Sequence, residues 1–167
     1  TGQVEPRHIE TFARLLGCIH DARAGDRQLA AEFADRSYFE SLRLAPYDGA
    51  AAEAVPAAAQ FLDTLMADTR GTSRALVHGD YSPKNVLIHD DTLVLLDHEV
   101  IHYGDPAFDV GFAMAHLLSK AHHLASRRDA FADAARGFWR HYQDAAGDTE
   151  PERAARHSIA CLLARVA

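Results

Sequence analysis

Three short polar segments carry residues that could hold a metal ion and phosphate. The segments are His78-Gly79-Asp80-Tyr81-Ser82-Pro83-Lys84-Asn85, Leu95-Leu96-Asp97-His98-Glu99 and Gly104-Asp105-Pro106-Ala107-Phe108-Asp109. Asp80 follows one short apolar run, Asn85 begins the next, and Asp97 ends a third, so strands would bring three oxygen-bearing side chains to one edge. Carboxylate and amide oxygens suit Mg²⁺, which keeps positions open for phosphate oxygens and water. The set predicts a site for magnesium and phosphate, as phosphoryl transfer requires.

The segments around these residues show strand patterns and then a helix start. Ala75–Val77 is a short apolar run that enters a polar turn. Val86–Ile88 and Leu93–Leu96 are two further apolar runs, separated by a polar connector of hairpin length. We therefore expect a strand followed by a β-hairpin. Asp105-Pro106 is typical of a helix start, with Asp as the cap and Pro in the first turn, and apolar residues keep helical spacing beyond it.

Helical periodicity dominates the rest of the chain. Apolar residues at helical spacing predict a helix over residues 6–24, short helices within 27–47 closed by Pro46, a helix ending near Gly71, and apolar faces at 131–142 and 159–166. The expected fold class is therefore α+β and mostly helical. No internal repeat or linker is visible, so the 167 residues predict one domain.

Composition narrows the classes of protein further. The chain has 17 Lys and Arg against 24 Asp and Glu, and this acidic balance argues against a nucleic-acid partner. The longest stretch without a charged side chain, residues 110–119, is shorter than the roughly 18 residues that a membrane-spanning helix needs. Cys18 and Cys161 cannot build a disulfide framework, and Cys18 is expected to be buried. We expect a cytoplasmic protein that makes no contact with a membrane.

The spacing His-Gly-Asp-x-x-x-x-Asn at residues 78–85 resembles the catalytic loop of the aminoglycoside phosphotransferase and choline kinase superfamily. The resemblance covers residues 76–118 and implies the C-terminal lobe of a protein-kinase-like fold, in which a small β-hairpin carries the catalytic loop. It implies that Asp80 is the catalytic base and that Asn85 and Asp97 are the Mg²⁺ ligands. It also implies that Asp109 braces the catalytic loop and that His78 orients it.

Three neighbouring side chains have weaker assignments as contacts of substrate or phosphate. Lys84 could steady the γ-phosphate, although a solvated loop lysine fits its position equally well. Ser82 could bond either to substrate or to its own loop. Glu99 could lie near the metal or contact a cationic substrate, or it could be an ordinary surface carboxylate.

The departures from this family of kinases are as informative as the match. Asp97-His98-Glu99 stands where protein kinases have Asp-Phe-Gly, which argues against a protein kinase. The chain has no Gly-x-Gly-x-x-Gly loop, and neither of its two lysines, Lys84 and Lys120, is placed to clamp a nucleotide from a strand. We therefore expect residues 1–167 to be the C-terminal lobe of a longer protein. Its partner would be an N-terminal nucleotide lobe missing from this chain, and the lobe alone would be inactive.

The expected reaction is transfer of a phosphoryl group from ATP or GTP, with Mg²⁺, to a hydroxyl of a small-molecule substrate that the sequence does not identify. The alternative is a non-catalytic lone lobe, or a degenerate kinase-like binding module. A zinc site is disfavoured because His116, His122 and His123 lack the i, i+4 spacing of zinc ligands on a helix. A serine hydrolase is disfavoured because no Gly-x-Ser-x-Gly elbow exists.

Overall fold

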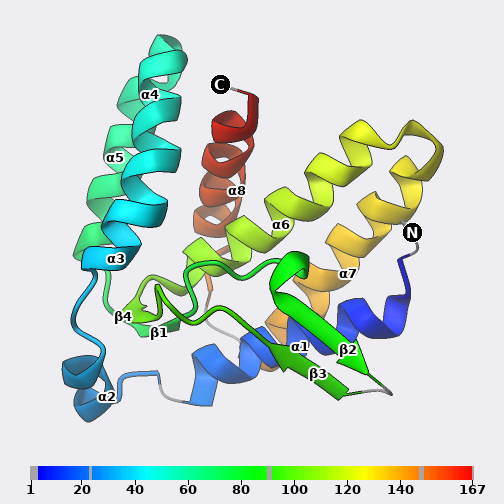
Figure 1. The fold of residues 1–167 in the computed structure, drawn as a ribbon, viewed down its shortest axis with the longest axis horizontal. Helices are drawn as coiled ribbons and strands as arrows, with labels where there is room; N and C mark the ends of the chain where they lie inside the picture. Colours follow the sequence, from blue (N-terminus) through cyan, green and yellow to red (C-terminus); the bar gives the residue numbers. More distant parts are fainter. Residues whose placement is uncertain (1–3, 23, 90–91, 147–148, 167) are drawn as a thin grey trace.

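The computed structural model describes residues 4–22, 24–89, 92–146 and 149–166, and over these ranges the chain is mostly helical (Figure 1). The α-helices are α1 (Pro6–Ala22), α2 (Arg27–Glu32), α3 (Ser37–Phe39), α4 (Ala50–Ala54), α5 (Ala59–Gly71), α6 (Pro106–His123), α7 (Arg128–Ala146) and α8 (Pro151–Val166). The shorter or wider helical segments are η1 (Glu40–Gly49), η2 (Pro56–Ala58), η3 (Pro83–Asn85) and η4 (Ala125–Arg127). Small antiparallel sheets complete the fold, which confirms the expected α+β class. None of the helices in the described ranges combines the length and the apolar composition that crossing a bilayer requires.

Helix α6 lies at the centre of the structure, with α7 and α8 packed against it and α1 packed against α7 (Figure 1). It begins where the sequence predicts, because Pro106 occupies the first turn and Asp105 Oδ1 accepts a hydrogen bond of 3.1 Å from the backbone N–H of Ala107. Most of its first half is buried. The helix therefore serves as the scaffold on which the polar loops before it are fixed.

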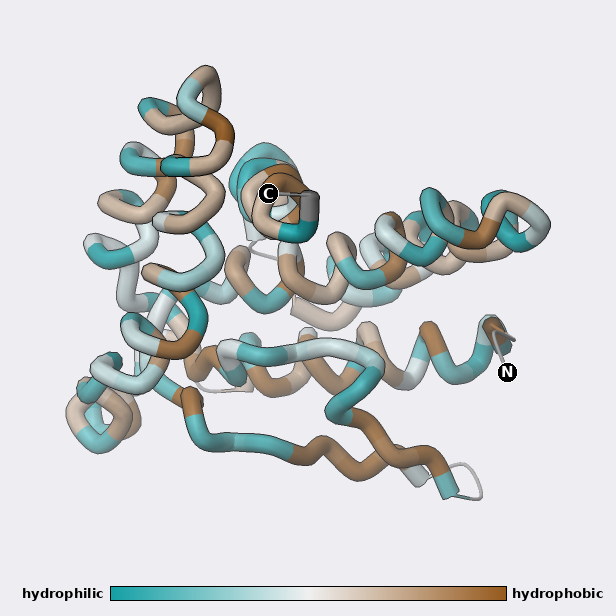
Figure 2. Tube along the Cα trace, turned by 45° about the horizontal axis from the view of Figure 1, so that its top comes forward, coloured by the Kyte–Doolittle hydropathy of each residue, from teal (hydrophilic) through white to brown (hydrophobic). Residues whose placement is uncertain are grey.

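The four strands form two separate ladders within the described residues. β1 (Ala75–Val77) pairs antiparallel with β4 (His102–Gly104), with Leu76 opposite Tyr103. The predicted hairpin is confirmed: β2 (Val86–His89) pairs with β3 (Thr92–Leu95), with Val86 opposite Leu95. Its strands are hydrophobic along most of their length (Figure 2), and the outward side chains of Leu87 and Val94 are about half exposed.

Segments α3, η1 and α4 run on from one another as a single helical rod beside α5 (Figure 1). The prediction that Pro46 closes a helix is therefore wrong, since Pro46 lies inside η1. Proline removes one N–H and clashes with the carbonyl four residues earlier in an α-helix. In η1 the hydrogen bonds follow the wider π pattern, with bonds to the fifth residue back, and the chain passes through Pro46 without a break.

The expectation that Cys18 is buried is also wrong, because its side chain is exposed, whereas that of Cys161 is buried. The neighbouring Gly17 faces α7 so closely that an added Cβ would lie 2.5 Å from Ala145 Cβ. Successive residues of an α-helix are about 100° apart around its axis. Cys18 is therefore turned away from the contact that Gly17 makes.

Asp48, in η1, is buried, and neither of its carboxylate oxygens has a hydrogen-bond partner among the described residues. Burial raises the pKa of Asp48 to about 6, against the opposing charges of His157 and Arg70. When a carboxyl has a higher pKa in the folded state than in the unfolded state, the protein loses stability as the pH rises from the unfolded-state pKa through the folded-state pKa.

We expect Asp48→Asn to raise the free energy of unfolding at pH 7 by about 2 kcal/mol. Urea unfolding at several pH values tests this, and the wild-type protein should lose stability between about pH 4 and pH 6 while the variant does not. Equal stabilities at pH 7 would contradict it.

Candidate functional site

The loop between β1 and the hairpin makes a sharp turn at Gly79. Its φ is +80°, and an added Cβ would lie 2.9 Å from Cγ2 and 3.0 Å from the carbonyl oxygen of Val100. Only glycine adopts this conformation without strain and also fits this space. The turn directs the next residue, Asp80, into a buried position.

His78 joins this loop to the end of the hairpin. Its Nδ1 accepts a hydrogen bond of 3.2 Å from the backbone N–H of Asp80, so Nε2 carries the proton and donates to the Leu96 carbonyl at 3.0 Å. The ring is buried. The loop and the segment that leads into Asp97 are thus held in one arrangement by a single side chain.

Asp109, in the first turn of α6, holds the loop in place through hydrogen bonds. Its carboxylate accepts hydrogen bonds from the backbone N–H groups of His78 at 2.7 Å and Gly79 at 2.8 Å, and it lies 3.2 Å from His20 Nε2. Burial raises the pKa of Asp109, but its hydrogen bonds with His20 and with the backbone of His78, together with its electrostatic attraction to these two residues, outweigh burial and lower the pKa below its usual value. The buried side chain is therefore an ionised carboxylate that stabilises the loop. His20 is held in turn by the hydroxyl of Tyr142 at 2.9 Å.

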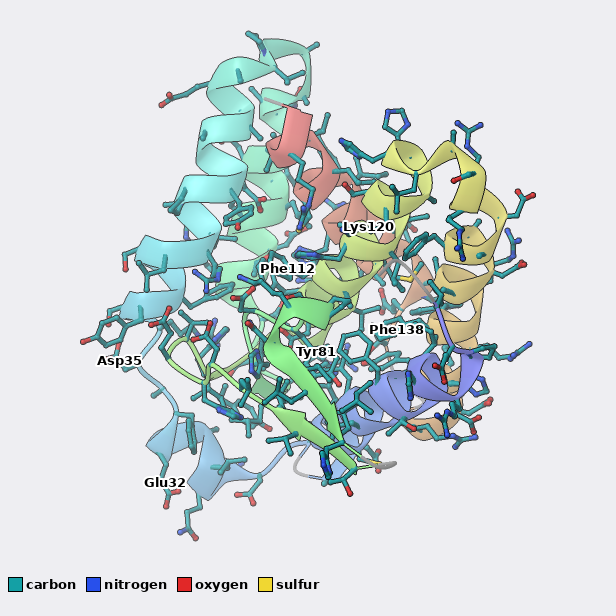
Figure 3. All side chains as sticks on the ribbon, turned by 45° about the vertical axis from the view of Figure 1, so that its right-hand side comes forward. Glu32, Asp35, Tyr81, Phe112, Lys120 and Phe138 are labelled. Carbon is teal, nitrogen blue, oxygen red and sulfur yellow. The ribbon has the colours of Figure 1, made fainter. Side chains whose placement is uncertain are left out.

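Tyr81 anchors the loop on its other side. Its ring, labelled in Figure 3, stacks on Phe12 of α1 with centroids 4.5 Å apart, and its hydroxyl donates to the Phe12 carbonyl at 2.7 Å. Phe12 also packs against Phe138 of α7. The loop is therefore tied to the hydrophobic core as well as to α6.

Asp80 has two differently placed carboxylate oxygens. Its Oδ2 lies 2.8 Å from Arg43 Nη2 and 2.9 Å from Lys84 Nζ. Its Oδ1 is buried and has no hydrogen-bond partner among the described residues. A carboxylate with one oxygen fixed by cations and the other free can accept a hydrogen bond, or a proton, from an added hydroxyl group.

Arg43 is the site residue that the sequence analysis missed. It comes from η1, and its side chain is only 13% exposed. Besides Asp80, it donates to the Leu42 carbonyl at 2.9 Å, and Nη2 lies 3.7 Å from Glu99 Oε1. Arg43 thereby brings the exposed Glu99 to the Asp80 side of the site. No spacing or motif links Arg43 to the loop, so the sequence carried no signal for this contact.

The predicted metal ligands lie close together along the backbone. Asn85 is buried, and its Nδ2 donates a hydrogen bond to the Asp80 carbonyl at 2.9 Å. The Oδ1 atom of the amide is then the one that could bind a metal ion. The backbone N–H of Leu96 donates to the Asn85 carbonyl at 2.9 Å, which places Asp97 one residue away. Asp97 itself is exposed and has a φ of 66°.

Ser82 is buried in the same loop, and its hydroxyl has no partner among the described residues. Asp80, Ser82, Lys84 and Asn85 thus all belong to the same loop, at residues 78–85. Across the described ranges, no group of three or more His, Cys, Asp or Glu side chains is arranged to hold a metal ion. Any metal here would depend on amide, water and phosphate oxygens in addition to carboxylate.

Comparison with known proteins adds one finding. The model of the family described as the phosphotransferase enzyme family matches residues 1–164, which is nearly the whole chain. No curated protein matches the chain.

Proposed function

Because the chain belongs to the phosphotransferase enzyme family, we propose that it transfers the γ-phosphoryl group of ATP or GTP to a hydroxyl group of a small molecule. Family membership supports phosphoryl transfer in general, and the nucleotide, the metal and the hydroxyl acceptor are our proposals. The observation that carries them is the buried Asp80 carboxylate, with one oxygen held by Arg43 and Lys84 and the other free. Such a group can align and deprotonate an attacking hydroxyl.

We propose further that this chain is the C-terminal lobe of a kinase-like fold. The helical scaffold, the hairpin and the loop at residues 78–85 support this assignment. The full sequence contains no Gly-x-Gly-x-x-Gly segment. The second wall of the nucleotide cleft would then come from another part of the protein.

Mg²⁺ would be held by Asn85 Oδ1 and the Asp97 carboxylate. Both are hard oxygen donors, and the Asn85 amide is turned by its hydrogen bond to Asp80 so that Oδ1 remains available. One amide and one carboxylate leave most positions of the ion for phosphate oxygens and water, which fits the preference of Mg²⁺. When bound, the ion would supply charge neutralisation for the phosphates.

The residues of the chain would act mainly by positioning. Asp80 Oδ1 would hold the acceptor hydroxyl and take its proton as the new P–O bond forms and the bond between the γ-phosphorus and the departing nucleoside diphosphate breaks. Arg43 would keep the carboxylate in place through Oδ2. Lys84 could steady the transferred phosphoryl group, and the free hydroxyl of Ser82 could bind either phosphate or acceptor. Glu99, beside Arg43, is proposed to contact substrate.

The Asp97→Ala variant of the full-length protein tests the metal assignment. We expect its affinity for Mg-ATP and Mg-GTP to fall at least about tenfold, because one of the two protein ligands of the ion is lost. Isothermal titration calorimetry measures this directly. Asp144→Ala on α7 is the matched control, since it removes another exposed carboxylate away from the loop. Unchanged affinity in Asp97→Ala would count against the assignment.

A further inference from the structure

A cavity of about 620 Å³ lies beside the catalytic loop. Its lining comes from the start of α1, from η3, β2 and the second half of α6, and from the ends of α7 and α8 that face it. Lys84 of η3, Lys120 of α6 and Arg165 of α8 all contribute to the wall. Figure 3 labels Lys120 on α6. The two lysines of the chain therefore line the same cavity, joined by an arginine.

Two of these three cations, Lys120 and Arg165, pair with no carboxylate among the described residues, whereas Lys84 pairs with Asp80. Glu5 is the one acid among the lining residues that the structure describes, and it lies 3.0 Å from Arg7 Nε and 3.8 Å from His8 Nε2. The cavity thus has an excess of positive charge in a protein whose net charge is −7.

His116 also lines the cavity and is affected by these positive charges. Its Nε2 accepts a hydrogen bond from Arg165 Nη2, so the ring is neutral in this arrangement. Burial and the charge of Arg165 lower the pKa of His116 to about 4, with further contributions from Lys84 and Lys120 that Asp80 partly opposes. At neutral pH the ring therefore acts as a hydrogen-bond acceptor that orients Arg165 and adds no charge of its own.

We propose that the phosphoryl acceptor is a small hydroxyl compound that also carries an anionic group, a carboxylate or a phosphate, and that this group binds between Lys84, Lys120 and Arg165. The proposal rests on the proposed function and names its substrate class. Lys84 lines the cavity and its Nζ is also 2.9 Å from Asp80 Oδ2, so this one side chain links the cavity to the carboxylate proposed as the base. Carboxylate and phosphate form charge-assisted hydrogen bonds with such side chains. A polycationic acceptor would meet like charge there.

Binding of simple anions to the full-length protein tests the site without turnover. Inorganic phosphate and acetate are titrated separately, and the ring signals of His116 are followed by NMR. The His116→Gln variant assigns these signals. Glycerol and ethanolamine serve as neutral and cationic control compounds. We expect saturable shifts with at least one anion and none with glycerol or ethanolamine. Lys120→Gln should weaken anion binding about tenfold, and the exposed control Arg128→Gln should change it less than twofold. Whichever of phosphate and acetate binds more tightly identifies the group. Equal effects of the two substitutions, or no saturable shift, would overturn the proposal.

Acceptor preference separates this proposal from the proposed function. With Mg-ATP, we expect kcat/KM for hydroxy acids or sugar phosphates to exceed that for neutral polyols and amino alcohols at least about tenfold, and Lys120→Glu to reverse this preference. Transfer that favours amino alcohols would overturn the anionic site and leave phosphoryl transfer standing. Anion binding that depends on Lys120, without phosphoryl transfer to any hydroxyl compound, would support the site and refute the proposed reaction.

Discussion

Asp80→Asn is expected to lower kcat of the full-length protein by about three orders of magnitude, which lies within the usual contribution of a general base. The amide has nearly the shape of the carboxylate and can still accept a hydrogen bond from Arg43, but it cannot take the proton of an acceptor hydroxyl. The loss should therefore appear mainly in kcat, and KM for nucleotide should change little. Steady-state kinetics with the preferred acceptor provides the measurement.

Two controls distinguish this effect from damage to the fold. Asp144→Asn removes a charge from an exposed position on α7 and should retain wild-type turnover. The urea unfolding midpoint of Asp80→Asn should confirm that the variant is folded at the assay temperature. Near-normal kcat in a folded Asp80→Asn variant would remove Asp80 from the mechanism.

Asp109→Ala is expected to cost about 3–5 kcal/mol of unfolding free energy, the largest stability effect that we expect from a single substitution in this site. The substitution leaves the backbone N–H groups of His78 and Gly79 and the ring of His20 without their acceptor in a fully buried place. Asp109→Asn keeps one acceptor oxygen and should cost roughly half as much. Urea unfolding of both variants checks the order.

The pH dependence gives an independent check on the same carboxylate. Because the pKa of Asp109 is lowered in the folded state, its stabilisation is present above the unfolded pKa and is lost as the pH falls through the folded pKa. We expect this acid-dependent loss in the wild-type protein and a smaller one in Asp109→Asn. A cost below about 1 kcal/mol for Asp109→Ala would contradict the bracing role, because a buried unpaired donor alone costs that much.

The elements that position the site could be predicted because their signals are local. Asp105-Pro106 caps α6 within its own first turn, and two apolar runs on either side of the polar residues 89–92 predict the hairpin without distant contacts. The loop at residues 78–85 carries its own glycine turn, and the family match agrees with the resemblance of its motif.

Contacts between distant segments could not be predicted in the same way. Arg43 reaches Asp80 across 37 residues, and the prediction that Pro46 ends a helix gave no reason to look for that contact. Strand β4 is only three residues long, His102-Tyr103-Gly104, and contains no apolar run or alternation that would mark it as a strand. The exposure of Cys18 follows from the close packing of Gly17 on α7, which depends on a partner helix far along the chain.

The basic cavity illustrates the same limit. Lys84, Lys120 and Arg165 lie on three elements that only the packing of α6 against α8 and the loop brings together. In the sequence each is an isolated cation in an acidic protein. The substrate class that we propose therefore depends on the tertiary structure, whereas one short motif already points to the reaction class.

Phosphorus NMR of the full-length protein with ATP, Mg²⁺ and a panel of hydroxyl compounds tests phosphoryl transfer most directly. The spectrum distinguishes a new phosphate ester from inorganic phosphate, so it separates transfer to a hydroxyl from hydrolysis. We expect a phosphate monoester of at least one acceptor, formed with ADP in equal amount, and no such product from the Asp80→Asn variant. The absence of any phosphate ester from a protein that binds Mg-ATP would contradict phosphoryl transfer and favour a non-catalytic binding module.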